Sequence, residues 1–137
     1  MPTNLYGPND NYDLAKSHVL PALIRKFHSA RINSELSVSI WGTGKPQREF
    51  LHVDDLASAC YFLMKNYNEA GLVKIGVGKD ISILDLATIV KDVVGFSGTI
   101  EHDLSKPHWT NVNLKKCSFC ISVISNYGLV LNNFDYS

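Results

Sequence analysis

Three segments of the chain carry hydrophobic residues at helical spacing, and four shorter segments alternate or cluster them as β-strands do. The helical segments cover about 17–31, 54–68 and 82–95. The strand-like segments are 37–41, 48–53, 72–78 and 99–103. Helices and strands therefore follow one another in the order α–β–β–α–β–α–β, which predicts an α/β fold.

The first helix follows residues 1–16, which combine a strand end with a dense cluster of turn-forming residues. Ser17 is of the type that caps a helix N-terminus, and Pro21 falls in the first turn, where its missing N–H costs least. Its apolar face comprises Leu20, Leu23, Ile24 and Phe27. We therefore expect Ser17 to cap a helix that buries this face.

The other two helices also carry start signals. Asp54 or Asp55 is expected to cap the second helix, and Ser82 with Asp85 forms a capping box at the start of the third. Gly95 is placed to end the third helix. The expected buried faces are Leu56, Cys60, Leu63 and Tyr67 on the second helix, and Leu86, Ile89, Val90 and Val93 on the third.

Composition narrows the class of protein. The 137 residues are 45% hydrophobic, and 13 basic side chains balance 13 acidic ones without a basic run, so no nucleic-acid or membrane-surface partner is expected. No segment approaches the roughly 20 apolar residues of a membrane span. Three cysteines, an odd number without disulfide spacing, favour a reducing compartment, and we expect a cytoplasmic protein.

The segment from residue 41 to 55 holds the most suggestive polar chemistry. Trp41 precedes the tight turn Gly42-Thr43-Gly44, and Arg48 begins the next strand. A guanidinium there could grip a phosphate, and an indole could stack on a base or sugar. Alternatively Trp41 is a core residue and Arg48 a salt-bridged edge residue, and the pattern leaves both open. The turn is too short for a dinucleotide-binding fingerprint.

Three other groups have simple alternatives. His18 opens the first helix, where it could exchange a proton with a ligand or bond to nearby backbone. Cys117-x-x-Cys120 has no second pair, so we expect free cysteines and no metal site, although His102 and His108 could complete a ligand set on paper. Asp54 and Asp55 could act as an acid–base pair, but a helix cap explains them more simply.

Several separate motifs in order closely resemble the GDP-L-fucose synthase family of extended short-chain dehydrogenase/reductases. They are Pro2-Thr3-Asn4-Leu5-Tyr6-Gly7-Pro8-Asn9-Asp10-Asn11, Ser17-His18-Val19-Leu20-Pro21-Ala22-Leu23-Ile24-Arg25-Lys26-Phe27-His28, the segment 41–55, Gly76-Val77-Gly78-Lys79-Asp80-Ile81-Ser82-Ile83 and Ser105-Lys106-Pro107. We predict a substrate-domain segment over 1–107 and a diverged or frameshifted tail over 108–137. In that tail, His108 replaces an aspartate of the family and Asn113 replaces a lysine.

The resemblance implies roles for particular residues. The family converts GDP-4-keto-6-deoxy-D-mannose to GDP-L-fucose by epimerising two ring carbons and reducing the ketone with NADPH. Pro2, Thr3, Asn4 and Leu5 resemble the segment lining the nicotinamide end of NADP. His18 resembles a histidine near cofactor and sugar, proposed as an acid in epimerisation. Lys26, Trp41 and Arg48 resemble substrate contacts, with Arg48 as the diphosphate clamp.

The resemblance also implies that this chain matches the C-terminal substrate-binding part of the enzyme. The family's glycine-rich cofactor fingerprint and its catalytic Tyr-x-x-x-Lys, Ser and Cys lie upstream of the matched segments. We therefore expect no catalysis by this chain alone, and the complete family enzyme is expected to be a homodimer. The alternatives are a non-catalytic nucleotide-sugar-binding module or subunit, an enzyme acting on another nucleotide sugar, and a degraded gene product.

Overall fold

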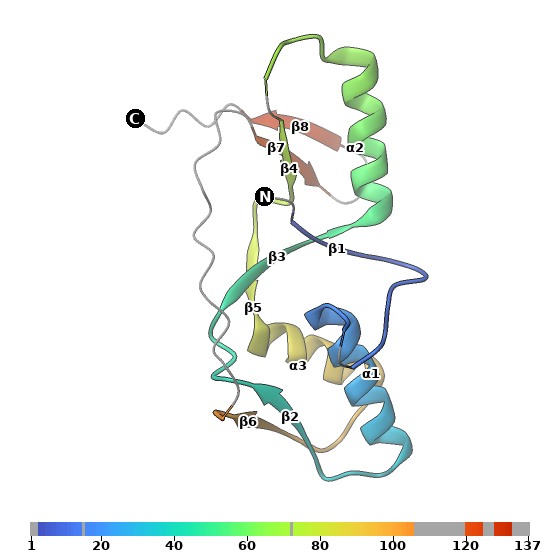
Figure 1. Ribbon diagram of the computed structural model, residues 1–137, viewed down its shortest axis with the longest axis vertical. Coiled ribbons are helices and arrows are strands. Elements are labelled where there is room, and N and C mark those ends of the chain that lie inside the picture. The colour runs from blue at the N-terminus through green and yellow to red at the C-terminus, as the bar shows by residue number, and fades with distance from the viewer. Residues whose placement is uncertain (1–2, 15, 72, 106–119, 125–127, 133–137) are drawn as a thin grey trace. The chain divides into compact units, whose positions relative to one another are not determined.

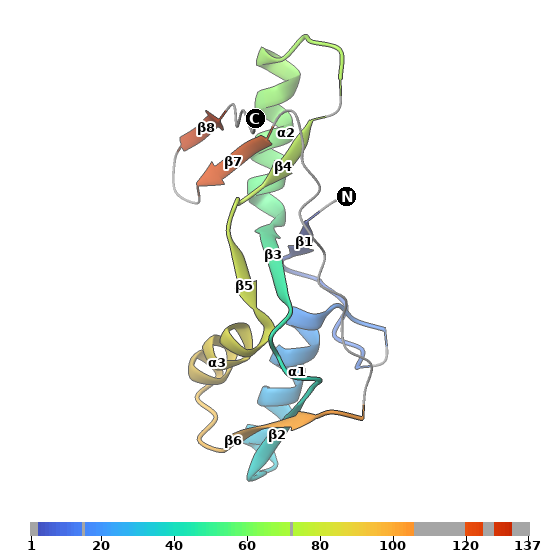
Figure 2. The same cartoon turned by 90° about the vertical axis from the view of Figure 1, so that its left-hand side faces the viewer.

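The computed structural model describes residues 3–14, 16–71, 73–105, 120–124 and 128–132, the last two ranges as backbone only. The chain divides into two compact units. The first comprises 1–8, 49–80 and 113–137, and the second comprises 9–48 and 81–112. Figures 1 and 2 show the helices and strands along the chain. None of the helices in the described ranges is long and apolar enough to cross a membrane.

The second unit contains helices α1 (Val19–Ile32) and α3 (Ile83–Val94) and strands β2 (Ser37–Trp41) and β6 (Thr99–Asp103). The two strands are parallel, in register from Ser37 beside Thr99 to Trp41 beside Asp103. Helix α1 packs against both β2 and α3. The buried apolar residues of this unit are Leu20, Leu23, Phe27, Ala30, Val38, Ile40, Ile83, Leu86, Ala87, Val90 and Phe96.

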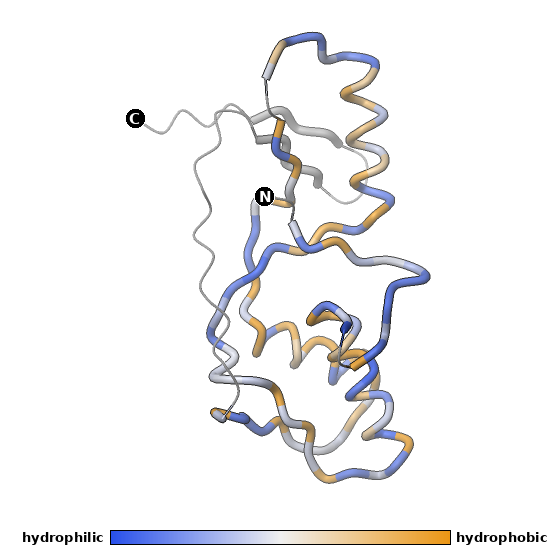
Figure 3. The backbone as a smooth tube through the Cα atoms, in the orientation of Figure 1, coloured by the Kyte–Doolittle hydropathy of each residue, from blue (hydrophilic) through white to orange (hydrophobic). Residues whose placement is uncertain are grey.

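The first unit is built around helix α2 (Val53–Asn66), along which apolar and polar residues follow one another in turn (Figure 3). Strand β1 (Asn4–Tyr6) pairs in parallel with β3 (Gln47–His52), and β5 (Asp80–Ser82) is the third strand of that sheet. Strand β4 (Lys74–Gly76) pairs in parallel with β7 (Cys120–Ile124), which pairs antiparallel with β8 (Gly128–Asn132). Leu51 and Ala59 are the buried centre of this unit.

The start of α1 corrects the prediction for Ser17. The helix begins at Val19, its N-cap residue is His18, and that cap makes no side-chain hydrogen bond. Ser17 instead belongs to the preceding turn, since its backbone N–H donates to the Asp13 carbonyl at 2.8 Å. The predicted Ser17 cap is therefore wrong, because this turn closes before the helical backbone starts. Most of the predicted apolar face is buried, with Ile24 half-buried.

The start and the buried face of α2 also differ from the prediction. The helix begins at Val53, and His52 caps it by accepting the Asp54 N–H on Nδ1 at 3.3 Å. Asp54 and Asp55 lie in the first turn instead, where negative charge still suits the positive end of the helix. Cys60 is exposed, and Ala59 is fully buried in its place. Leu56 and Leu63 pack against this buried centre as predicted, so Cys60 is the member of the predicted face that is wrong.

Helix α3 confirms the predicted capping box and its end. The Ser82 hydroxyl accepts the Asp85 N–H at 3.0 Å, and Gly95 takes the left-handed conformation that closes the helix at φ 72°. Ile89 and Val93 are 52% and 83% exposed, so their predicted burial is wrong. Ile83 and Ala87 are buried with Leu86 and Val90, and α3 as a whole packs against α1.

The α/β class is confirmed, and most of the strands match. β2 and β6 have the predicted bounds, β3 is shifted by one residue, and β4 is shorter than 72–78. Strand β5, with only three residues, was not predicted. β7 and β8 lie in the tail, where the hydrophobic pattern has no clear period.

Replacing Ser82 with alanine should destabilise the chain by about 1 kcal/mol, because the cap bond to the Asp85 N–H is lost. Urea unfolding monitored by circular dichroism measures this change. Ser97→Ala is the control, since Ser97 is exposed and its side chain makes no hydrogen bond among those described. Equal midpoints for the two variants would contradict the cap assignment.

Candidate functional site

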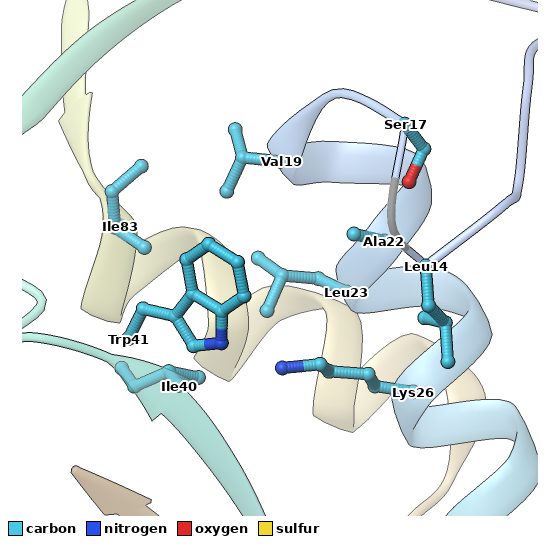
Figure 4. Close-up of a pocket in the computed structure, with 9 residues that line it drawn as sticks. All are labelled: Leu14, Ser17, Val19, Ala22, Leu23, Lys26, Ile40, Trp41 and Ile83. Carbon is cyan, nitrogen blue, oxygen red and sulfur yellow. The ribbon is translucent and has the colours of Figure 1, made fainter. Parts of the chain in front are cut away.

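A cavity of about 130 Å³ opens in the second unit, among α1, the end of β2 and the start of α3 (Figure 4). Its walls are mainly aliphatic, with one indole, one ammonium and one hydroxyl. The lining residues are Leu14, Ser17, Val19, Ala22, Leu23, Lys26, Ile40, Trp41 and Ile83. Such a space suits a ring-sized ligand group with a few polar atoms.

Trp41 and Lys26 form the polar end of this cavity. The Lys26 ammonium lies 5.7 Å from the centroid of the Trp41 ring and donates a hydrogen bond to the Ser39 carbonyl at 3.1 Å. Trp41 is 41% exposed, far above the core residues of β2. Trp41 is therefore not a core residue. Its ring offers a stacking surface beside the Lys26 ammonium.

The electrostatic state of Lys26 follows from its surroundings. Partial burial lowers its pKa below the usual value, and the negative charge of Asp103 opposes that change. Asp103 lies beside Trp41 in the register of β2 and β6. Its carboxylate also accepts from the N–H and hydroxyl of Ser105. Asp103 therefore helps to keep the ammonium charged next to the indole.

The predicted glycine turn is present and shapes this end of the cavity. Gly42 and Gly44 both have φ 68°, a conformation that side chains rarely adopt. A Cβ on Gly44 would lie 2.9 Å from the Leu84 side chain. The Gly44 carbonyl accepts the Leu84 N–H at 2.9 Å. Only glycine lets β2 end this close to the start of α3.

Arg48 and His18 do not line the cavity. Arg48 is half-buried on β3, and its Nη1 donates to the Gln47 carbonyl at 2.7 Å. His18 is exposed, although its neighbours Ser17 and Val19 both line the cavity. The structure thus brings together Lys26 and Trp41, and leaves Arg48 and His18 outside the wall that it describes.

The cofactor candidates Thr3, Asn4 and Leu5 lie in the first unit, at or beside β1, while Pro2 is outside the described residues. The Asn4 side-chain amide donates to the Glu49 carbonyl at 3.1 Å, and Leu5 packs against Leu51 and Ala59. These two side chains hold β1 in its sheet. They do not form a dinucleotide site by themselves.

The spacing Tyr-x-x-x-Lys does occur twice in the chain, at Tyr12 with Lys16 and at Tyr61 with Lys65. All four side chains are exposed, and neither pair lines the cavity. On α2 the Lys65 ammonium lies 5.0 Å from the Tyr61 ring centroid, as neighbours one turn apart can on a solvated helix face. The spacing alone gives neither pair a catalytic role.

The predicted acid–base pair, Asp54 and Asp55, lies in the first turn of α2. His52 Nδ1 lies 3.6 Å from the Asp54 carboxylate, next to the helix cap described above. Asp54 and Asp55 therefore serve the helix start. Cys117 and His108 fall outside the described residues, so the prediction of free cysteines there stays a prediction.

A family model described as "NAD dependent epimerase/dehydratase family" matches residues 1–76. That match spans more than half of the 137 residues. The chain belongs to this family. The resemblance expected from the sequence is thereby confirmed at the level of the family, and the parallel strands with intervening helices agree with it.

Individual relatives narrow the comparison. The chain is 56% identical over 110 residues to GDP-L-fucose synthase 1 of Arabidopsis thaliana, covering 80% of this chain and 34% of the relative. A solved GDP-L-fucose synthetase from Naegleria fowleri bound to NADP has a TM-score of 0.75 at 35% identity, over 80% of this chain and 33% of the other. The chain thus spans about a third of the length of these relatives.

A second solved structure differs in the sugar it handles. It is a GDP-6-OMe-4-keto-L-xylo-heptose reductase from C. jejuni, with a TM-score of 0.74 and 38% identity, over 84% of this chain and 44% of the other. Similarity to this segment therefore extends across enzymes named for different GDP-linked sugars.

Ser17 and Asp103 were not among the sequence-based site candidates. The residue type of Ser17 suggested a cap, and no local pattern marks Asp103, whose significance depends on the pairing of β6 with β2. Val19 and Leu23 also line the cavity, and an apolar position on a helix does not reveal that it faces a hollow.

Replacing Asp103 with asparagine should lower the pKa of Lys26 further, because the ammonium loses the opposite charge that favours it. NMR titration of ¹³C-labelled lysine side chains, with Lys26→Arg for assignment, measures the shift. Glu101→Gln is the matched control, since Glu101 is an exposed acid on the same strand. An unchanged or raised Lys26 pKa in Asp103→Asn would contradict the assignment.

Proposed function

We propose that this chain carries the nucleotide-sugar-binding part of a GDP-L-fucose synthase-type enzyme. The complete enzyme would convert GDP-4-keto-6-deoxy-D-mannose to GDP-L-fucose with NADPH. The observation that carries the proposal is the cavity bearing Trp41 and Lys26, in a segment 56% identical to a GDP-L-fucose synthase. A ring-sized space with aromatic, cationic and hydroxyl groups suits the nucleoside end of such a ligand.

Each polar residue has a role in this proposal. Trp41 supplies the stacking wall, and Lys26 supplies positive charge beside it. Arg48 is the diphosphate clamp, because a guanidinium can bind two phosphate oxygens at once. Its present bond to the neighbouring Gln47 carbonyl is one that a diphosphate would replace or supplement.

His18 is the candidate acid of the epimerisation. It caps α1 with its backbone while its side chain makes no cap bond and is exposed to solvent. An imidazole in that state can hold or release a proton at a ligand bound next to Ser17 and Val19. This assignment rests on the resemblance together with that position.

NADP is the cofactor of the complete enzyme in this proposal, where it supplies the hydride for reduction. Thr3, Asn4 and Leu5 would contribute only the edge of its site, given their roles in holding β1. We infer a homodimer in the cytoplasm for the complete enzyme, which mass measurement and cell fractionation would test.

The sugar is the point on which an alternative has support. The solved reductase of a GDP-linked heptose is as similar to this chain as the solved GDP-L-fucose synthetase is, with 38% against 35% identity. Another GDP-sugar is therefore the second candidate substrate. A chain that binds nucleotide sugars without catalysis, or completes another subunit, would show the same binding but no turnover. Both are separated from the main proposal by the measurements below.

The purified chain should bind GDP-L-fucose and GDP-mannose more tightly than UDP-glucose or dTDP-glucose in calorimetry. Arg48→Met should weaken GDP binding by about tenfold or more, because a charge-assisted bond to the diphosphate is lost. Arg25→Met is the control: it removes the same charge from an exposed position of α1 outside the cavity. Equal losses in both variants would contradict the clamp.

The chain by itself should not oxidise NADPH in the presence of GDP-4-keto-6-deoxy-D-mannose, since its described residues do not assemble a dinucleotide site. Loss of NADPH absorbance measures turnover, and a complete GDP-L-fucose synthase is the positive control. Turnover by the purified chain would overturn this expectation.

A further inference from the structure

Helix α2 carries a second apolar stripe besides the one that packs in the first unit. On its inner side Ala59 is buried, and Leu56 and Leu63 pack against that centre. A further set of its residues is apolar and exposed: Val53, Ala57, Cys60, Tyr61 and Met64. These positions recur at intervals of three or four, so they lie along one side of the helix and form an exposed stripe.

The exposed stripe offers a large apolar surface to solvent. Met64 is 85% exposed and Tyr61 is 62% exposed, although both side chains are long and mainly carbon. Single exposed apolar residues are common, whereas a contiguous set along one helix marks an interaction surface. A helix with apolar residues on two sides is typical of a helix that is covered on both.

Two charges lie along one flank of the exposed stripe. Asp54 is in the first turn of α2 and Lys65 is in the last, about three helical turns away on the same side. Both are exposed, and the Lys65 ammonium lies 5.0 Å from the ring centroid of Tyr61 in the stripe. The surface is therefore acidic at one end, basic at the other and apolar between them.

This pattern is self-complementary when two copies of α2 run in opposite directions. The exposed stripes then face each other, and Asp54 of each copy lies beside Lys65 of the other. Parallel helices would instead place Asp54 beside Asp54 and Lys65 beside Lys65, which is unfavourable. Charge complementarity therefore favours an antiparallel pair and a second copy over an unrelated partner.

Cys60 lies next to the middle of α2, which runs from Val53 to Asn66. In an antiparallel pair with two-fold symmetry, a residue at the middle of the helix meets its own copy. Cys60 is exposed, so its thiol is accessible in the free chain. The two Cys60 side chains of such a pair would therefore lie close together near the symmetry axis.

We propose that the exposed stripe of α2 is a self-association surface, on which a second copy of this chain packs with its own α2 antiparallel to the first. This surface lies apart from the nucleotide-sugar cavity, so it does not depend on the proposed function. The 14-residue helix is about 21 Å long, and the contact is correspondingly small. We expect a dissociation constant of about 1–100 μM.

Met64→Glu tests the surface by sedimentation equilibrium over a series of protein concentrations. The unsubstituted 137-residue chain should follow a monomer–dimer equilibrium. The variant should raise the dissociation constant about tenfold or more, because pairing would bury a carboxylate without a partner. Val93→Glu is the matched control, since it adds the same charge at an 83% exposed apolar position of α3. Circular dichroism checks that both variants are folded.

Lys65→Glu tests the orientation of the two helices. In the antiparallel pair it places like charges beside Asp54 at both ends, so the dissociation constant should rise about threefold or more. Adding Asp54→Lys to Lys65→Glu should restore the affinity, because each end again pairs opposite charges. Lys79→Glu is the control, with the same change of charge at an exposed position outside α2.

Cross-linking tests the position of the symmetry axis. Cys117→Ser with Cys120→Ser leaves Cys60 as the one cysteine of the chain. A short bismaleimide should then join two copies into a covalent dimer. The same treatment of a variant that also carries Cys60→Ser should leave monomers.

Several results would overturn the inference. The unsubstituted chain could remain a monomer at every concentration, or Met64→Glu could dimerise as well as Val93→Glu, which would place the dimer on another surface. An unchanged affinity in Lys65→Glu would exclude the antiparallel pair, as would a failure of Cys60 to cross-link in a chain that still dimerises.

Discussion

The packing of α1 against β2 and α3 is the constraint on which the candidate site depends. Phe27 is fully buried on α1 and meets Phe96 with ring centroids 5.7 Å apart, just beyond the end of α3. Those three elements also supply most of the cavity wall, from Val19 and Lys26 on α1 to Ile83 on α3. A change that moved α1 would therefore alter the core and the site together.

Close backbone approach completes this arrangement. Gly44, in a left-handed conformation, lets the end of β2 come within hydrogen-bond distance of the start of α3. The same turn leaves Trp41 at the strand end, with its ring half in solvent and near the Lys26 ammonium. The segment from Trp41 to Gly44 therefore contributes both to the packing of the fold and to the cavity wall. Its glycines serve the fold, and the side chains flanking them are available for binding.

Polar groups in this part of the molecule differ in how fully the fold satisfies them. The Ser82 hydroxyl caps α3, and Arg31 on α1 donates to the Val94 carbonyl at the end of the same helix. Lys26 has a backbone acceptor but is partly buried, which disfavours its charge. Ser17 has no partner at all among the described residues. The bonds of Ser82 and Arg31 therefore hold the fold, whereas the fold only partly compensates the charge of Lys26.

The sequence by itself determined what depends on neighbouring residues: the α/β order, the bounds of β2 and β6, the capping box at Ser82, the Gly95 end and the glycine turn. It also supplied the family, through motifs in order. The tertiary structure decided which residue caps α1, because the turn at Asp13 holds Ser17. It decided which side of α3 is buried, since Ile83 and Ala87 are covered while Ile89 and Val93 are exposed, and α3 packs against α1. It also brought Asp103 beside Trp41, more than sixty positions away in the chain. These outcomes depend on contacts between distant segments, and local spacing carries no information about which distant surface will cover a given face.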